Sequence, residues 1–394
     1  MGMTPRERVM LALNHKEPDR IPIDLGGTTI TSIHNTTYMA VRRHVGLPVE
    51  EIETIDPIQQ TPRVAEDFFE RFSVDFRMVQ LPHAGSIEVF EDGDYFAFVD
   101  RFGAKLRMPK DGGLYFDWVE FPLREFTPEE LDRYAWPEPD PIEDVLRLRD
   151  RARKLYETTD HALVGGAVIG GGIFEQPCRM MGLEQFMMSL VDDPRYAERL
   201  TGRLTDLYIA SCDRYLDEVG PYIQVFLFWD DVAGQDGWLI SPETYRRIIK
   251  PSQRRLFEAI KRKTDAKIFY HGCGAAFELI GDLIDIGVDI FNPVQVSARG
   301  MDTRRLKETY GRDIVFWGGG VDTQRVLPFG TPDEVRDEVK RRIDDLAPGG
   351  GFVFAAVHNI QAFVPPENVV AAFDTALEYG RYASVTAPGE AQPG

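Results

Sequence analysis

The feature that most constrains the fold is a regular alternation of short apolar runs and longer amphipathic runs, beginning near residue 145. The strand-like runs are Ala162–Val168, Tyr222–Trp229, Ala266–Tyr270, Asp289–Asn292, Ile314–Trp317 and Gly351–Val357. The helix-like runs are 183–218, 241–264, 275–286, 302–310, 331–345 and 366–382. This order is typical of an α/β fold in which helices cover buried parallel strands.

Two further segments bring the strand count to that of a closed barrel. With Phe76–Leu81 and the short Ile21–Leu25 run, the count reaches seven or eight. We therefore expect a (β/α)8 TIM barrel in preference to a doubly wound sheet. The absence of a G-x-G-x-x-G motif after the first strand also weakens a dinucleotide-binding interpretation.

We expect a single domain over residues 1–394, in which the segments outside the barrel are extensions and insertions of it. Thr4 to Glu7 has the pattern of a helix-capping box and opens an N-terminal extension. Residues 85–123 change to β-rich runs around Asp92-Gly93, which predicts a small antiparallel hairpin insertion. The last residues, 387–394, have the composition of a disordered tail.

Charge and cysteine content exclude several classes of function. The formal charge is −19, which argues against binding nucleic-acid backbones or anionic membrane surfaces. No run of apolar residues is long enough to span a bilayer. The start lacks the apolar core of a signal peptide, and three cysteines cannot build a disulfide framework. We expect a cytoplasmic protein with reduced thiols.

Polar residues follow nearly every predicted strand after residue 222. The five endings are Asp230-Asp231, His271-Gly272-Cys273-Gly274, Asn292-Pro293-Val294-Gln295, Gly318-Gly319-Gly320-Val321-Asp322 and His358-Asn359-Ile360-Gln361. In a barrel, all five lie at the C-terminal face, where active sites of this architecture are built. Five converging polar endings predict a functional site there.

One of these endings has the residue types of a zinc site. At a strand end, His271 and Cys273 point to the same side, so that imidazole and thiolate can share one ion. His358 is the best candidate for the third ligand, with Asp230 as the reserve. Three protein ligands and one open position are typical of catalytic zinc. The plainer alternative is that His271 and Cys273 pack, or cap the next helix.

Other strand-end residues are candidates for catalysis or substrate binding. Of the two adjacent aspartates, we favour Asp230 as the one that faces the barrel mouth and acts in catalysis, beside His271 and Cys273. Glu175 follows a glycine-rich strand ending, and Asn359 can orient His358. The full set of predicted substrate-binding residues is Asp24, Arg77, Glu175, Asp231, Gln235, Tyr270, Asn292, Gln295, Gly319, Asp322 and Asn359.

Several motifs together resemble the uroporphyrinogen decarboxylase superfamily over roughly residues 4–382. They are Pro5-Arg6-Glu7-Arg8, Pro18-Asp19-Arg20-Ile21-Pro22, Val74-Asp75-Phe76-Arg77, Ser241-Pro242-Glu243-Thr244-Tyr245, His271-Gly272-Cys273-Gly274, 287–295, Trp317-Gly318-Gly319, 321–324 and Val357-His358-Asn359-Ile360-Gln361. The resemblance implies a (β/α)8 barrel with its site at the C-terminal mouth, and homodimers are common in this superfamily.

Within the superfamily, the chain resembles the corrinoid-linked zinc methyltransferases more than the true decarboxylases. The arginine-rich motif that holds porphyrinogen carboxylates reads Ile23-Asp24-Leu25-Gly26-Gly27 here, without arginine. His271 and Cys273 match the zinc motif of the methyltransferase branch, whereas His358 stands where that branch has cysteine. One thiolate instead of two leaves zinc with a net charge near +1, which favours polarising an ether or alcohol oxygen.

These features lead to one preferred hypothesis and two alternatives. The preferred one is a zinc-dependent transfer of a methyl group from a small O-methyl donor to a corrinoid. Because no D-x-H-x-x-G motif occurs, the corrinoid would be carried by a partner protein. The first alternative is a metal-free decarboxylase that stabilises a cationic intermediate with Asp230 or Asp24. The second is a barrel that binds such a ligand or partner without turnover.

Overall fold

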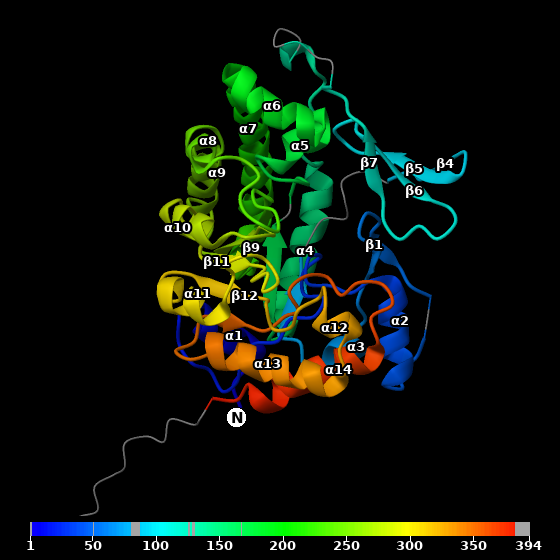
Figure 1. Cartoon of the computed structure of the whole chain (residues 1–394), viewed down its shortest axis with the longest axis vertical. Helices are drawn as coiled ribbons and strands as arrows, with labels where there is room; N and C mark the ends of the chain where they lie inside the picture. The colour runs from blue at the N-terminus through cyan, green and yellow to red at the C-terminus, as the bar shows by residue number, and fades with distance from the viewer. Residues whose placement is uncertain are drawn as a thin grey trace, which may run out of the picture.

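Seven parallel strands form the centre of the molecule (Figure 1). The computed structural model describes residues 2–382 except 50, 80–86, 125–126, 128–130 and 167. Along the sheet, the strands are β13 (Phe352–Val353), β12 (Val315–Trp317), β11 (Ile290–Asn292), β10 (Lys267–His271), β9 (Val225–Trp229), β8 (Ala162–Gly166) and β3 (Phe76–Met78). Strands that are adjacent in this order are parallel, which confirms the α/β barrel prediction.

The Ile21–Leu25 segment closes the ring between β13 and β3. The Asp24 N–H donates to the Phe354 carbonyl at 2.8 Å, and the Phe354 N–H donates to the Pro22 carbonyl at 2.9 Å. On the other side, the Asp75 N–H donates to the Ile23 carbonyl at 2.9 Å. This extended segment therefore occupies the eighth position of the barrel, so that the expected count of seven or eight strands is resolved as seven strands and one closing segment.

A buried ion-pair network holds this closing segment in place. The Asp75 carboxylate accepts hydrogen bonds from Arg8 at 2.6 Å, from Arg20 at 2.7 Å and from the Ile23 N–H at 2.7 Å. Arg8 also pairs with Asp19. These residues belong to the N-terminal motifs of the family resemblance, and their contacts give those motifs a structural role at the barrel wall.

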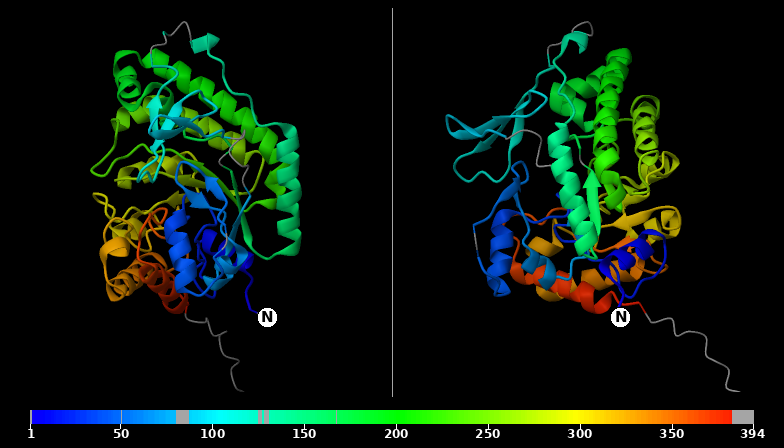
Figure 2. Two further views of the ribbon diagram at one scale, coloured as in Figure 1. Left: turned by 90° about the vertical axis from the view of Figure 1, so that its right-hand side faces the viewer. Right: turned by 180° about the vertical axis from the view of Figure 1, so that it is seen from behind.

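Helices surround the ring (Figures 1 and 2). The predicted capping box at Thr4 is present, and Thr331 forms a second one at the start of a later helix. The predicted helix 183–218 is divided at Asp193, because Pro194 has no N–H to continue it and starts a new helix.

The helices are α1 (Pro5–Leu13), α2 (Asn35–His44), α3 (Glu66–Arg71), η1 (Leu131–Arg133), α4 (Ile142–Thr158), α5 (Glu175–Met181), α6 (Leu183–Asp192), α7 (Pro194–Val219), η2 (Gly220–Tyr222), α8 (Pro242–Thr244), the π-helical turn η3 (Tyr245–Ile249), α9 (Lys250–Lys261), α10 (Phe277–Asp285), α11 (Thr303–Tyr310), α12 (Val326–Phe329), α13 (Pro332–Leu346) and α14 (Pro366–Tyr379).

The predicted insertion is a four-stranded antiparallel sheet, with the short pair β1 (Thr54–Asp56) and β2 (Thr61–Pro62) nearby in sequence. Its strands are β4 (Phe90–Asp92), β5 (Tyr95–Val99), β6 (Lys105–Pro109) and β7 (Asp117–Glu120). One face has its own small core of Phe98, Leu106 and Phe116. Figure 2 shows the sheet standing off the barrel, away from the N-terminus.

The tail 387–394 lies outside the described residues. Among the described helices, none is both long and apolar enough to cross a membrane.

Asp24 is a buried hub beneath the barrel mouth, and it predicts a pH dependence of stability. Its carboxylate accepts hydrogen bonds from the Gly27 N–H, the Thr31 hydroxyl and the Trp317 indole. Burial raises its pKa to about 7. Between about pH 4 and pH 7 the native state therefore holds a proton that the unfolded chain has lost, so unfolding becomes easier as pH rises.

We expect Asp24 to contribute a loss of up to about 4 kcal/mol in the free energy of unfolding across this pH range. The measurement is denaturant unfolding at several pH values, compared between the wild type and Asp24→Asn, which cannot titrate. Asp374→Asn, at an ion pair whose side chains are about one third exposed, is the control. An identical pH slope in the wild type and Asp24→Asn would contradict the assignment.

Candidate metal centre

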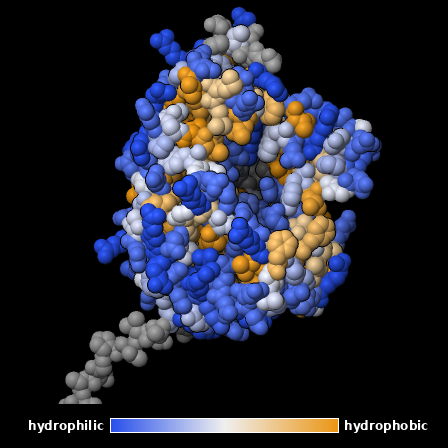
Figure 3. Space-filling view, in the orientation of Figure 1, coloured by the Kyte–Doolittle hydropathy of each residue, from blue (hydrophilic) through white to orange (hydrophobic). Residues whose placement is uncertain are grey.

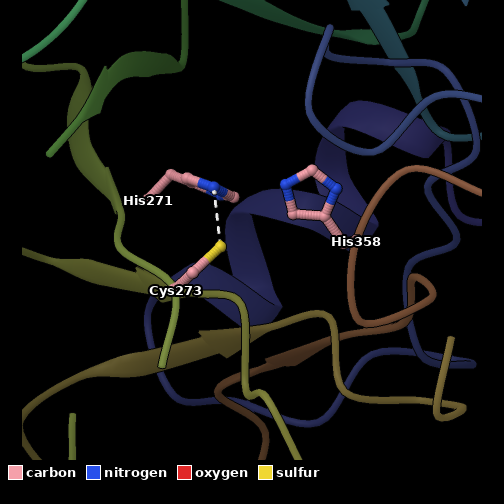
Figure 4. A group of neighbouring side chains, drawn as sticks. All are labelled: His271, Cys273 and His358. Atoms are coloured by element: carbon pink, nitrogen blue, oxygen red, sulfur yellow. Dashed lines mark hydrogen bonds between the residues drawn. The ribbon is translucent and has the colours of Figure 1, made fainter. Parts of the chain in front are cut away.

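Three side chains predicted as metal ligands lie together at the C-terminal end of the barrel. His271 ends β10, Cys273 follows it, and His358 comes from the loop after β13 (Figure 4). Their ligand atoms all lie within 4.8 Å of one another. The Cys273 Sγ and His271 Nε2 atoms are 3.4 Å apart, and the two imidazole centroids are 5.2 Å apart.

Asn292 fixes the orientation and the tautomer of His271. The Asn292 Nδ2 group donates to the Trp317 carbonyl at 2.8 Å, which leaves its Oδ1 atom facing His271 Nδ1 at 2.6 Å. An amide oxygen only accepts, so His271 Nδ1 carries the proton and Nε2 keeps its lone pair. The lone pair faces Cys273, as a metal ligand requires.

Replacement of Asn292 by Ala is expected to weaken zinc binding by about 10–100-fold, the usual effect of removing a partner that orients a ligand. Competition with a chromophoric chelator measures this affinity. Asn368→Ala is the matched control, since Asn368 is equally buried and bonds the Leu327 and Gly330 carbonyls elsewhere. If both variants bind zinc as the wild type does, Asn292 does not position His271.

Burial shifts the protonation equilibria of the cluster toward neutral forms. Burial lowers the pKa of His271, and burial together with the nearby His271 ring lowers that of His358 to about 3. Both imidazoles are therefore neutral near pH 7, the form that ligates metal. In the metal-free chain, burial and the carboxylates of Asp231 and Glu175 raise the pKa of the Cys273 thiol.

The cluster opens onto a cavity of about 370 Å³, within the usual range for small-molecule sites. Figure 3 shows the surface hollowed between the helical body and the lobe that carries β4–β7. Of the predicted residues, the cavity is lined by Glu175, Asp231, His271, His358 and Asn359. Asp231 also accepts the Cys273 N–H at 2.7 Å, and Asn359 accepts the Ser32 N–H at 2.7 Å.

Asp230 does not face the barrel mouth, contrary to the prediction, and Asp231 takes that place. The Asp230 carboxylate is fully buried and accepts hydrogen bonds from the N–H groups of residues 173–175 and from Gln253. A Cβ atom at Gly172 would lie 2.1 Å from the Asp230 Cγ, so only glycine permits this close approach. Asp230 thus anchors the loop that carries Glu175. The sequence alone does not show which of two adjacent aspartates takes this role.

Several other residues that were predicted to bind substrate do not line the cavity, and they contact other parts of the protein. Arg77 pairs with Glu66, and the Tyr270 hydroxyl donates to the Asp230 carbonyl. Gln295 bonds Gln235 and the Gly274 N–H, so this pair supports the loop after Cys273. The other three also have structural contacts. Asp24 accepts the Gly27 N–H, Gly319 lies against Val294, and Asp322 accepts the Gln324 N–H.

Sequence reasoning missed the residues that the insertion and α5 bring to the cavity. They include Asp100, Arg101, Trp118, Gln176 and Arg179, and the end of β9 adds Trp229, which was also missed. Arg179 pairs with Glu175 and lies 4.5 Å from the centroid of the Trp118 ring. The spacing of Glu175 and Arg179 by one helical turn was a usable signal. No local pattern indicated that one face of the insertion would meet the barrel mouth.

The residues present fit a zinc ion. One thiolate and two neutral imidazoles form a donor set that zinc prefers, and with bonds of about 2.0–2.3 Å the 3.4 Å separation of Sγ and Nε2 suits a shared ion. His271 and His358 line the cavity, which leaves room for a fourth ligand. Such a site is of the catalytic rather than the closed structural type.

Comparison with known proteins places the chain in a family. The family model described as uroporphyrinogen decarboxylase (URO-D) matches residues 94–379. A uroporphyrinogen decarboxylase of Xanthomonas euvesicatoria is 25% identical over 392 residues, covering 93% of this chain and 96% of the relative. Another, from Syntrophotalea carbinolica, is 27% identical and covers 64% of this chain and 68% of the relative.

Among solved structures, a methyltransferase from Methanosarcina mazei has the same fold, with a TM-score of 0.63 and 19% sequence identity, covering 96% of this chain and 99% of that one. The family match extends over most of the barrel and includes the strand ends that carry His271, Cys273 and His358. The chain therefore belongs to the uroporphyrinogen decarboxylase (URO-D) family.

Proposed function

We propose that this protein is a zinc-dependent methyltransferase, which takes a methyl group from a small O-methyl donor and passes it to a corrinoid on a partner protein. The observation that supports this most is the cluster of His271, Cys273 and His358 at the wall of the cavity. These three residues would hold zinc, which supplies Lewis acidity to the heteroatom that loses the methyl group.

The surrounding residues have roles that follow from their contacts. Asn292 keeps the Nε2 lone pair of His271 directed toward the cluster. Asp231 holds the backbone of Cys273, and Asp230 holds the loop before α5. Asn359 binds the Ser32 N–H and so fixes the loop that carries His358. A donor in the cavity would therefore meet a preorganised set of ligands.

The comparisons support an enzyme of this family and are divided on the reaction. The fold neighbour from Methanosarcina mazei is described as a methyltransferase, whereas the curated relatives are described as uroporphyrinogen decarboxylases. These relatives favour the alternative of a metal-free decarboxylase. The cavity argues against a polycarboxylate substrate, because the two arginines found among its described lining residues are paired, Arg101 with Asp140 and Arg179 with Glu175.

Methyl transfer is tested with the zinc-loaded protein, a panel of methoxylated donors and chemically reduced cob(I)alamin as acceptor. Absorbance reports the formation of methylcobalamin. Zinc-dependent methylcobalamin with at least one donor supports the proposal. If uroporphyrinogen is decarboxylated and no donor is demethylated, the decarboxylase alternative holds. If a donor binds and nothing turns over, the non-catalytic alternative holds.

Replacement of His358 by Cys is expected to retain zinc and to slow demethylation of an ether donor. A second thiolate lowers the net charge of the zinc site from about +1 to about 0, and with it the Lewis acidity. We expect kcat/KM to fall at least about tenfold, equivalent to about 1.4 kcal/mol. An unchanged preference among oxygen and sulfur donors would contradict the charge argument.

A further inference from the structure

The cavity has two chemically different walls. His271, His358, Asp231 and Glu175, from the ends of the barrel strands and the start of α5, form one, here named the metal wall. Ile58, Phe98, Val99 and Trp118, from the antiparallel insertion and the β1–β2 loop, contribute an apolar wall. Phe98 packs on Phe116 with centroids 5.0 Å apart and is 1% exposed, so the insertion's own core supports this wall.

We propose that the methyl donor is a neutral aryl methyl ether, with its ring against the apolar wall and its methylated oxygen toward the metal wall. This inference rests on the methyltransferase function proposed above. It assigns the antiparallel insertion a role in substrate selection, because the insertion supplies most of the apolar wall.

The size of the cavity favours a donor larger than methanol. A water molecule occupies about 30 Å³, so methanol, with two heavy atoms, would occupy about 60 Å³. The cavity measures about 370 Å³, and methanol would leave most of it to water beside an apolar surface. A flat ring excludes that water. Binding then gains the free energy of burying apolar area on the ring and on the apolar wall.

The charges that line the cavity favour a neutral donor. Among the described residues, five carboxylates line it, from Asp56, Asp100, Asp140, Glu175 and Asp231, against two guanidinium groups. Both guanidinium groups are already paired, so a carboxylate on the donor finds no free arginine among the described lining residues.

A cationic donor is disfavoured for a different reason. All five carboxylates already have partners: Asp140 and Glu175 pair with arginine, Asp56 and Asp100 each accept two backbone N–H groups, and Asp231 accepts the Cys273 N–H. The methylated end of the donor lies at the metal wall, where a zinc site with one thiolate has a net charge near +1. Glu175 on this wall is paired with Arg179, so a methylated cation would meet the positive zinc site with only the carboxylate of Asp231 to offset it.

Three probes with one ring and different charges test the inference: 4-methoxyphenol, 4-methoxybenzoate and phenyltrimethylammonium. Their affinities for the zinc-loaded full chain are measured by isothermal titration calorimetry. We expect 4-methoxyphenol to bind at least about tenfold more tightly than either charged probe. Equal or tighter binding of 4-methoxybenzoate or phenyltrimethylammonium would overturn the inference.

A matched pair of variants tests the position of the ring. Val99 lines the cavity at its rim and is 52% exposed, so Val99→Lys leaves the fold intact and adds a cation to the apolar wall. We expect this variant to bind 4-methoxybenzoate about tenfold more tightly than the wild type does. Val119→Lys, an exposed site on β7 outside the cavity lining, should not change it. An unchanged affinity in Val99→Lys would place the ring elsewhere and overturn the inference.

Turnover separates failure of this inference from failure of the proposed function. If 4-methoxyphenol binds with the expected preference and its methyl group is never transferred to cob(I)alamin, the ligand class stands and the methyltransferase function fails. If methanol is demethylated and 4-methoxyphenol does not bind, methyl transfer stands and the aryl ether inference is overturned.

Discussion

Replacement of Cys273 by Ala should remove zinc from the purified protein and abolish methyl transfer. Cys273 is the one thiolate of the cluster, and its Sγ atom lies 3.4 Å from His271 Nε2. Loss of a partner that merely orients a ligand costs about 10–100-fold in metal affinity, so loss of the thiolate itself should cost more than about a hundredfold. Mass spectrometry of the native protein should show about one zinc per wild-type chain and almost none in the variant.

The other cysteines provide the control for this experiment. Cys212→Ala also removes a buried thiol, on α7 away from the cluster, and should retain zinc. Zinc that stays bound in Cys273→Ala, or that is lost equally in Cys212→Ala, would show that the cluster is not the metal site. If the wild type takes up no zinc after reconstitution at neutral pH, the metal-free decarboxylase and the non-catalytic binding protein remain as the alternatives.

The largest loss of stability is expected from Asp75→Ala. Asp75 is fully buried and accepts hydrogen bonds from two arginines whose side chains are 8% and 12% exposed. Removal of the carboxylate leaves Arg20 without an acidic partner, leaves Arg8 with Asp19 alone, and deletes the bond to the Ile23 N–H of the closing segment. Breaking a buried pair of this kind costs about 3–5 kcal/mol in the free energy of unfolding.

Urea denaturation followed by circular dichroism measures this loss. Asp374→Ala removes the carboxylate of the Arg71–Asp374 pair, whose side chains are about one third exposed, and should cost less than about 1 kcal/mol. If the two variants unfold at the same urea concentration, the network around Asp75 does not stabilise the barrel closure.

The sequence alone determined the barrel and the three clustered residues, because both depend on local order. Strand and helix periodicity predicted the six strands after residue 145, and strand ends of a parallel sheet must meet at one edge. The alternation of residues along an extended chain placed His271 and Cys273 on one side. The position of His358 at the end of another predicted strand made it the best candidate for their partner.

Tertiary structure decided everything that depends on a contact between distant segments. Asp230 and Asp231 are adjacent and chemically identical, and only the close approach of Gly172 determines that Asp230 is buried and Asp231 reaches the cavity. Asp75, Arg8 and Arg20 read as family motifs, and their function at the barrel closure is visible only when the ring is formed.

The apolar wall of the cavity could not be predicted from the sequence either. The β-rich run that contains Phe96 and Phe98 predicted a strand of a hairpin, and it carried no information about what this strand covers. Packing of the antiparallel insertion over the barrel mouth brings Phe98 and Trp118 to the same cavity as His271 and His358. Local periodicity thus determined the elements and their inward faces, whereas the long-range packing that builds a cavity between two sheets was decided only in three dimensions.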